Sequence, residues 1–253
     1  MTDFLANIHI VMVGTTLPAN IGSAARAMHT MGLSLLTVVN PKLPIDDSSI
    51  ANAAGGVSIL QSAQITKDLP TAVQDASLIF ACSSRSRHLP RPVVTPNQSA
   101  VLMHNFLSKN SNAKIAILFG REDRGLTNDE LALADYHIQI PANPAYPVLN
   151  VASSVQVIAS ALYAHFTDVI KDPVHALTIT HRVDWDTPAI TYNQKQALES
   201  SFIQMMQALN LADDDLKDLP KRLSRLSSRL QLDQKEYTML RAILAKLSKT
   251  IAK

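Results

Sequence analysis

Arg26 lies in a stretch of residues with almost no side chains, NIGSAARAM, which runs from position 20 to position 28. The stretch follows an apolar run, and Asn20 is a good candidate for the residue that caps a new helix. Side chains on a helix lean toward its N-terminus, so Arg26 could lie back over Gly22 and Ser23. The small residues could leave a path for a ligand to reach the guanidinium. Alternatively, they could permit tight helix packing beside an ordinary surface arginine.

A second segment, FGREDRGLTNDEL, places four charged residues directly after an apolar strand candidate. In α/β sheets, ligand sites lie at the carboxyl ends of parallel strands. Gly120 and Gly125 bracket the charges and indicate a specific backbone path. Thr127 and Glu130 have the spacing of a capping box that starts the next helix. The alternative is a solvated loop in which the four charges pair with one another: Arg121, Glu122, Asp123 and Arg124.

Three prolines punctuate the third segment, IPANPAYPVLNVASS, which follows another strand candidate. Proline fixes φ and lacks an amide N–H, so this loop should be stiff and should expose carbonyl groups. A stiff backbone suits the recognition of a flat heterocycle by main-chain groups, although an ordinary rigid turn could have the same composition. The helical spacing of Val151, Val155, Ile158 and Leu162 then predicts a long packed helix.

Short β-rich runs alternate with helical patterns over the first 166 residues. This alternation predicts an α/β domain with a mostly parallel, buried sheet. The expected strands are 8–13, 35–39, 77–83, 115–120 and 136–140, and the expected shorter helices are 20–32, 70–76, 97–107 and 127–134.

The remainder of the chain is expected to be a linker over 167–191 and a helical, basic segment over 192–253. Between Asp215 and Lys253 there are ten Lys or Arg and four Asp or Glu, whereas the whole chain has a net charge of only +2. A basic appendage favours a polyanionic partner, with nucleic acid as the first candidate. In the expected helix near 218–230, one face carries leucines (219, 223, 226 and 230) and another carries Arg222, Arg225 and Arg229. The alternative to RNA docking is a structural bundle with a solvated basic face.

Composition and motifs exclude several classes of protein. No apolar run approaches the roughly 20 residues that span a bilayer, and the N-terminus lacks a secretory pattern. Cys82 is the only cysteine, so no intramolecular disulfide can form and a cytoplasmic location is expected. There is no glycine-rich dinucleotide motif, no P-loop and no histidine spacing typical of a metal site. We therefore expect neither a metal ion nor a membrane partner.

Taken in order, NIGSAARAM, FGREDRGLTNDEL and IPANPAYPVLNVASSVQV resemble the three motifs of the SPOUT-class RNA 2′-O-methyltransferases, and the TrmJ branch in particular. The resemblance covers residues 7–166 and implies a SPOUT methyltransferase domain over 1–166. Its mostly parallel sheet would carry a deep C-terminal trefoil knot, a rare exception to the rule against knots, and a small α-helical extension would follow. The resemblance also implies a homodimer and the cofactor S-adenosyl-L-methionine. Its cofactor contacts would fall on Cys82, Ser83, Ser84, Gly120, Ile140, Val148, Leu149 and Asn150.

The resemblance makes Arg26 the catalytic residue of an enzyme that methylates the ribose of tRNA nucleotide 32, a cytidine or uridine. A guanidinium with a pKa above about 12 is a poor general base by itself. We therefore expect Arg26 to bind a phosphate and to orient the 2′-hydroxyl. The expected RNA-binding arginines are Arg85, Arg87, Arg121, Arg222, Arg225 and Arg229. The alternatives are the same chemistry on another RNA, such as ribosomal RNA, and a non-catalytic RNA-binding protein that kept the knotted domain.

Overall fold

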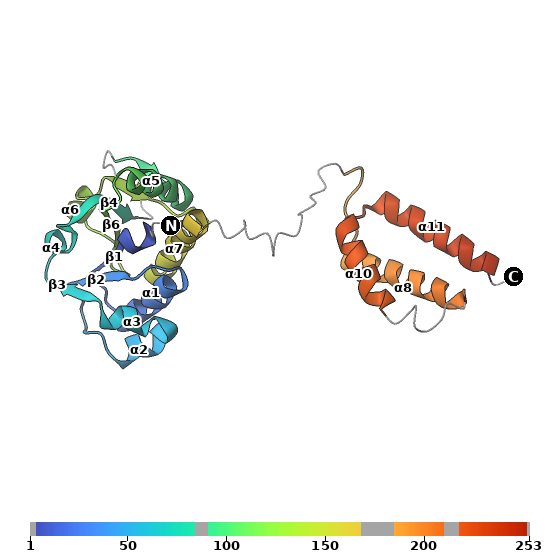
Figure 1. Cartoon of the computed structure of the whole chain (residues 1–253), viewed down its shortest axis with the longest axis horizontal. Coiled ribbons are helices and arrows are strands. Elements are labelled where there is room, and N and C mark those ends of the chain that lie inside the picture. The colour runs from blue at the N-terminus through green and yellow to red at the C-terminus, as the bar shows by residue number, and fades with distance from the viewer. Residues whose placement is uncertain (1–3, 84–90, 168–184, 210–217, 252–253) are drawn as a thin grey trace. The chain divides into compact units, whose positions relative to one another are not determined.

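The computed structural model describes residues 4–83, 91–167, 185–209 and 218–251, in two units (Figure 1). The N-terminal unit is assigned to Met1–Lys171 and the C-terminal unit to Asp172–Lys253. The strands of the N-terminal unit are β1 (Ile8–Val13), β2 (Leu35–Val39), β3 (Gln64–Thr66), β4 (Ala76–Cys82), β5 (Val93–Val94), β6 (Lys114–Phe119) and β7 (Tyr136–Ile138). Its helices are α1 (Pro18–Thr30), α2 (Asp47–Ala53), α3 (Val57–Gln61), α4 (Leu69–Val73), α5 (Pro96–Lys109), α6 (Asn128–Ala132) and α7 (Val151–Thr167), with 3-10 turns η1 (Phe4–Asn7) and η2 (Ala54–Gly56).

The described strands form one parallel sheet in the order β3-β2-β1-β6-β4-β7-β5. In its centre, Val11 of β1 lies opposite Thr37 of β2 on one side and Leu118 of β6 on the other. Because all the pairs are parallel, the carboxyl ends of the strands meet along a single edge of the sheet. The expected α/β domain with a parallel sheet is confirmed.

Helices cover both faces of this sheet, which explains why its strands are apolar throughout. Successive residues of β1 alternate between the two faces: Ile10 and Met12 belong to the larger core and Val11 to the smaller one. The larger core is closed by α1, α3, α5 and α7, and the smaller one by α4 and α6 (Figure 1). The predicted apolar stripe of α7 is confirmed, since all four of its residues are buried in the larger core.

Sequence patterns missed several short elements. The strands β3 and β5 span three and two residues, and α2 and α3 span seven and five, which is too short for a clear period. The expected start of α1 at residue 20 is wrong. The helix begins at Pro18, a position where proline is favoured, and Leu17 is its N-cap. Asn20 is therefore not the cap: it lies buried in the first turn of α1.

Two glycines let the segment α2–η2 approach α1 closely. A Cβ on Gly22 would overlap the carbonyl oxygen of Ser49, and a Cβ on Gly56 would lie 2.6 Å from the carbonyl oxygen of Ala25 and 2.9 Å from the backbone nitrogen of Arg26. Gly22 is buried in this packing. Its small size therefore serves helix packing, and the hypothesis that it leaves a path toward Arg26 is wrong for Gly22.

The described part of the C-terminal unit contains α8 (Tyr192–Ala208), α10 (Leu219–Leu230) and α11 (Gln234–Ile251). Backbone hydrogen bonds join the segment before α8 to the start of α11: the N–H of Ile190 donates to Leu232 O, and that of Gln234 donates to Pro188 O. The last residues of the expected linker are thus part of this unit. The expected leucine face of α10 is only partly packed, because residues 226 and 230 are exposed. No helix among the described residues is long and apolar enough to cross a membrane.

The adjacent glycines at positions 55 and 56 offer a matched test of the close approach. Gly56→Ala should lower the free energy of unfolding of the N-terminal unit by about 1–3 kcal/mol, because the new methyl group meets backbone that cannot move aside. In Gly55→Ala the new Cβ lies 3.5 Å from the ring of His29, an ordinary contact, so stability should change little. Chemical denaturation of both variants provides the measurement. Equal stabilities would contradict the role assigned to Gly56.

Candidate functional site

A pocket lies at the carboxyl edge of the sheet, where segments after β4, β6 and β7 meet the start of α7. Its wall combines apolar side chains, such as Phe119 and Leu126, with the charged loop that follows β6. Six of the eight residues expected to contact a cofactor line this pocket: Cys82, Ser83, Gly120, Ile140, Val148 and Leu149. Asn150 is not among the lining residues but lies between two of them, Leu149 and Val151, and Ser84 lies outside the described residues. Tertiary structure thus brings together residues that are more than 60 positions apart.

The charged loop after β6 is held closed by its own backbone. The N–H of Gly125 donates to Arg121 O over 2.8 Å, and the N–H of Arg121 donates back to Gly125 O over 3.3 Å. Gly125 has a φ of +70°, and a Cβ on Gly120 would overlap the backbone at Gly125 and Leu126. Both glycines are therefore required by the turn, as the bracketing predicted.

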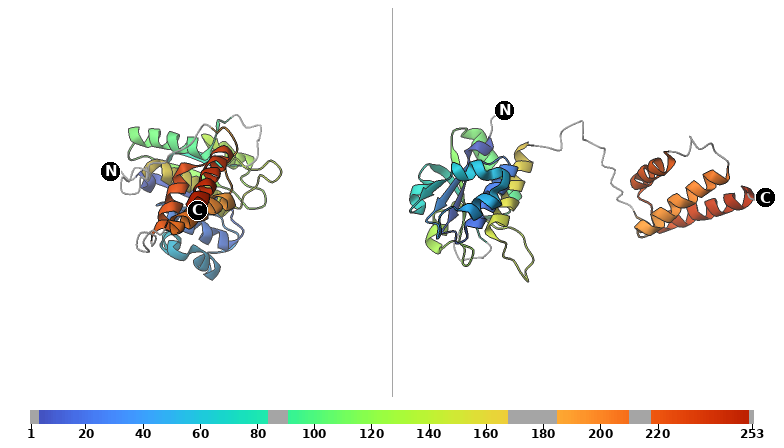
Figure 2. Two further views of the ribbon diagram at one scale, coloured as in Figure 1. Left: turned by 90° about the vertical axis from the view of Figure 1, so that its right-hand side faces the viewer. Right: turned by 90° about the horizontal axis from the view of Figure 1, so that it is seen from below.

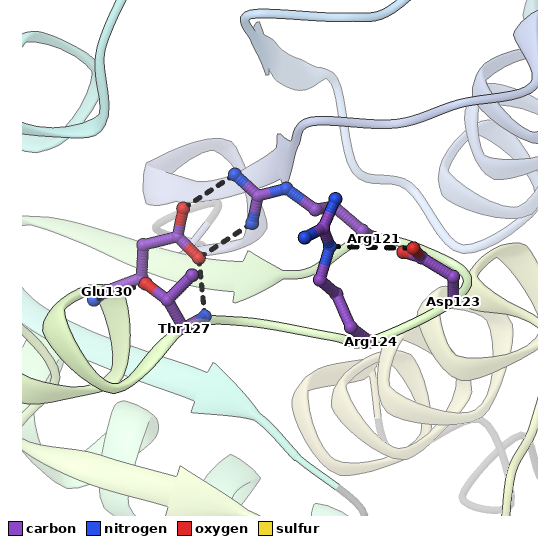
Figure 3. Close-up of polar contacts among 5 residues, drawn as sticks. All are labelled: Arg121, Asp123, Arg124, Thr127 and Glu130. Atoms are coloured by element: carbon purple, nitrogen blue, oxygen red, sulfur yellow. Dashed lines mark hydrogen bonds and ion pairs between the residues drawn. The ribbon is translucent and has the colours of Figure 1, made fainter.

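Arg121 forms a short, largely buried ion pair with Glu130 (Figure 3). Its two terminal nitrogens donate to the two carboxylate oxygens of Glu130 over 2.9 and 3.0 Å, with only 19% and 16% of the two side chains exposed. The expected capping box is present, because the Glu130 carboxylate also accepts from the N–H of Thr127 and the Thr127 hydroxyl accepts from the N–H of Glu130. Arg121 therefore anchors α6 to the pocket loop. Its expected role in RNA binding stays a prediction.

The four charges of the loop do not simply pair with one another. Arg124 contacts Asp123 over 3.5 Å, and both side chains are largely exposed (Figure 3). Arg121 and Glu122, by contrast, bond to residues outside the charged run. The alternative of a self-paired solvated loop therefore holds for Asp123 and Arg124 only.

Glu122 joins the loop after β6 to the beginning of α1. Its carboxylate accepts hydrogen bonds from the backbone N–H of Thr16 over 2.9 Å, from that of Leu17 over 3.3 Å and from the Asn20 side chain over 2.7 Å. Burial alone would raise the pKa of Glu122, but these donors together hold it below its usual value. The ionised carboxylate is thus part of the folded structure.

Asn150 extends this network to the third segment. Its amide nitrogen donates to Asn20 Oδ1 over 3.0 Å, and its own Oδ1 accepts from the N–H groups of Ala152 and Ser153 at the start of α7. Asn20 is therefore the link between the segments that carry Glu122 and Asn150. The sequence offered no local signal for this role, because the partners lie 102 and 130 residues away.

Arg26 lies on α1 with an exposed side chain and does not line the pocket. It lies six residues after Asn20 on the same helix, and hydrogen bonds from Asn20 to Glu122 and from Asn150 to Asn20 anchor the start of that helix. Cys82 forms part of the pocket floor, and burial raises the pKa of its thiol to about 12. The thiol is therefore protonated at neutral pH and acts as a small apolar group.

Of the remaining residues expected to bind RNA, the structure describes some and not others. Arg85 and Arg87 lie outside the described residues. Arg222 is exposed near the start of α10. Arg225 and Arg229 follow on the same helix, but the structure does not describe their side chains. Among the described residues, no group of three or more His, Cys, Asp or Glu could hold a metal ion.

The ion pair between Arg121 and Glu130 gives a stability prediction with a defined pH dependence. Hydrogen bonds from Arg121 and Thr127 outweigh the effect of burial and lower the pKa of Glu130. Its contribution to stability is therefore present above the pKa of the unfolded state, near 4.5, and is lost as the pH falls through the lower folded value. Glu130→Gln, which can still cap α6, should lower the free energy of unfolding by about 1–3 kcal/mol at pH 7.

Denaturation of the wild type and Glu130→Gln at pH 7 and at pH 3 checks this prediction, because the difference between them should shrink at the lower pH. Asp123→Asn is the control from the same loop. Its exposed ion pair should contribute no more than about 0.5 kcal/mol. A pH-independent difference for Glu130→Gln would contradict the assignment.

Comparisons with known proteins identify the family of this chain. Residues 7–160 match the SpoU rRNA Methylase family. The chain is 36% identical over 248 residues to the tRNA (cytidine/uridine-2′-O-)-methyltransferase TrmJ of Pectobacterium atrosepticum, covering 97% of this chain and 98% of that one. It is 35% identical over 251 residues to an uncharacterized tRNA/rRNA methyltransferase of Haemophilus influenzae, covering 98% and 97%.

Comparison with solved structures points to the same kind of protein as the sequence relatives. A probable methylase family protein from Haemophilus influenzae aligns with a TM-score of 0.60 at 35% identity, over 98% of both chains. TrmJ from Z. mobilis aligns with a TM-score of 0.60 at 27% identity, over 96% of this chain and all of that one. The predicted SPOUT-type fold is confirmed, while the trefoil knot stays a prediction. By its sequence match and its fold, this chain belongs to the SpoU methylase family.

Proposed function

We propose that this protein is an S-adenosylmethionine-dependent tRNA methyltransferase that modifies the 2′-hydroxyl of nucleotide 32, a cytidine or uridine, in the cytoplasm. The observation that supports it most directly is the hydrogen-bonded network of Asn20, Glu122 and Asn150, which assembles all three motifs around one pocket. Relatives that span nearly the whole chain are named tRNA (cytidine/uridine-2′-O-)-methyltransferases, which supports the tRNA substrate and the 2′-hydroxyl. Methylation of another RNA is the second candidate, because the description of the matched family names ribosomal RNA as the methylated molecule.

The residues of the pocket fit the cofactor. Apolar side chains of Phe119, Leu126 and Leu149 can enclose a flat purine, and a Cβ-free Gly120 brings backbone close to it. The carboxylate of Asp123 on the rim suits a cationic group. When bound, S-adenosylmethionine supplies an electrophilic methyl group on a sulfonium. The contact residues named from the sequence, Asn150 and Ser84 included, are proposed as its binding set.

Arg26 is the proposed catalytic residue. A guanidinium that stays charged binds an RNA phosphate well and accepts a proton poorly. Arg26 therefore holds the target nucleotide so that the ribose 2′-oxygen faces the pocket, and positioning supplies most of its effect on the rate. The close packing at Gly22 and Gly56 fixes the backbone of α1 from which Arg26 projects.

A homodimer with an active site shared between two copies is part of the proposal. From residue 136 to residue 167 the chain contains no Asp, Glu, Lys or Arg. The exposed face of α7 in this region carries Ser153, Val157, Ser160 and Ala164. The cores of protein–protein interfaces are depleted in charged residues, so this face suits contact with a second copy.

The proposed reaction is tested by incubating the protein with labelled S-adenosylmethionine and bulk tRNA and then mapping the methylated nucleotide. Label at the 2′-oxygen of nucleotide 32 is expected. Arg26→Ala should reduce methyl transfer by at least 100-fold, because the substrate is no longer positioned, while calorimetry should show unchanged cofactor binding.

Lys109→Ala controls for the loss of a positive charge, since Lys109 is exposed at the end of α5 that leads to the amino edge of the sheet. Substantial residual turnover of Arg26→Ala would overturn its role. Absence of heat with S-adenosylmethionine would instead indicate an RNA-binding protein without catalysis.

The basic C-terminal unit is proposed to dock tRNA. Arg222→Glu should weaken tRNA binding several-fold and reduce the slope of affinity against salt concentration, because fewer counterions are released. Lys109→Glu is the control for the same charge change elsewhere. Fluorescence titrations at several salt concentrations measure both quantities. If Arg222→Glu behaves like Lys109→Glu, the structural-bundle interpretation of this unit is correct.

A further inference from the structure

Tyr146 is an aromatic side chain left outside the packing of the N-terminal unit. Its exposed fraction is 79%. Among the described Phe, Tyr and Trp residues of this unit, it is the only one that is exposed. The large rings elsewhere in the described part of the unit are buried or half-buried, as Phe80 and Tyr136 are in their stacked pair. Among the described rings of this unit, Tyr146 is therefore the one whose face is most accessible to a binding partner.

The backbone that carries Tyr146 has a defined path. The N–H of Tyr146 donates to Asn143 O and the N–H of Ala145 donates to Asn143 Oδ1, both over 2.9 Å. Pro144 and Pro147 restrict the chain on either side. All residues from 141 to 148 are exposed, and Figure 2 shows the segment between β7 and α7 projecting from the domain. A ring on such a loop loses little further backbone freedom when it binds a partner.

The ring also lies directly beside the candidate cofactor pocket in the chain. Pro147, Val148 and Leu149 line the pocket, and Tyr146 directly precedes them in the chain with its side chain exposed to solvent. Arg124, a largely exposed cation, lies on the rim of the same pocket. Exposed aromatic rings and arginines are groups that bind single-stranded RNA, the rings by stacking on bases and the arginines through phosphates.

We infer that Tyr146 is a stacking platform for the base of the nucleotide whose ribose is methylated, or for the base next to it. This inference rests on the proposed function. In a nucleotide, the base is attached to C1′, the neighbour of the C2′ that carries the reacting hydroxyl. A ribose presented to the pocket therefore brings its base near the segment that carries Tyr146, because the next residues of that segment line the pocket. Stacking holds an unpaired base without selecting its identity, which suits an enzyme that accepts both cytidine and uridine.

The experiment compares Tyr146→Ala and Tyr146→Phe in the full chain, using an anticodon stem-loop RNA with a fluorescent pyrimidine analogue at nucleotide 32. Tyr146→Ala should weaken RNA binding about tenfold and abolish the quenching of the analogue, whereas Tyr146→Phe should retain both. Ile65→Ala is the control, since Ile65 is an apolar side chain with 60% exposure on the edge strand β3. Calorimetry with S-adenosylmethionine and the mass by light scattering are measured on every variant.

Three results would overturn the inference. Unchanged affinity and quenching in Tyr146→Ala would exclude stacking. A loss of mass in Tyr146→Ala would show that the ring contacts a second copy, and an equal loss of cofactor affinity would show that it covers the cofactor. None of these readouts uses methyl transfer, so a wild type that quenches the analogue but transfers no methyl group would refute the proposed function and still support the stacking role.

Discussion

The carboxylate of Glu122 is the interaction on which the candidate site depends. It accepts hydrogen bonds from two backbone N–H groups before α1 and from Asn20, whose own oxygen accepts from Asn150. Three segments that are each attached to a different part of the sheet are thereby fixed to one another. Glu122 is half-buried, and its many hydrogen-bond donors favour the ionised carboxylate, which lowers its pKa. The pocket is shaped by this network together with the closed turn at Gly120.

Arg121 and Glu130 stabilise the same loop from the other side. Their bidentate pair ties the turn to α6, so the pocket loop is held between α1 and α6. A loop with fixed backbone groups is suited to binding a cofactor mainly through main-chain atoms, because little order has to be created on binding. The cost is that Arg121, one of the positive charges nearest the pocket, is already engaged by a carboxylate. The proposed binding of an RNA phosphate therefore rests on Arg26, whose side chain is exposed.

The small residues around Arg26 have a physical explanation that differs from ligand access. Gly22 and Gly56 bring the segment α2–η2 against α1, and this packing leaves Arg26 on the exposed side of the helix. Tight packing and a functional arginine are therefore compatible, since the first fixes the backbone from which the second projects. In the C-terminal unit, by contrast, the leucine face of α10 is incompletely covered and Arg222 is exposed. This surface fits the proposed docking of a polyanion better than a closed bundle would.

The sequence by itself determined the longer strands and helices, the capping box at Thr127 and the family, and most of the cofactor contacts expected from it line the pocket. These features depend on short-range periodicity, on local turn chemistry, or on motifs that keep their order along the chain. Only the tertiary structure decided that Asn20 links two motifs instead of capping a helix, that Gly22 packs against Ser49, and that Arg121 pairs with Glu130. The first two contacts join residues that are far apart in the chain. The pair of Arg121 and Glu130 depends on how the turn between them folds back. The spacing of neighbouring residues therefore could not predict any of these three contacts.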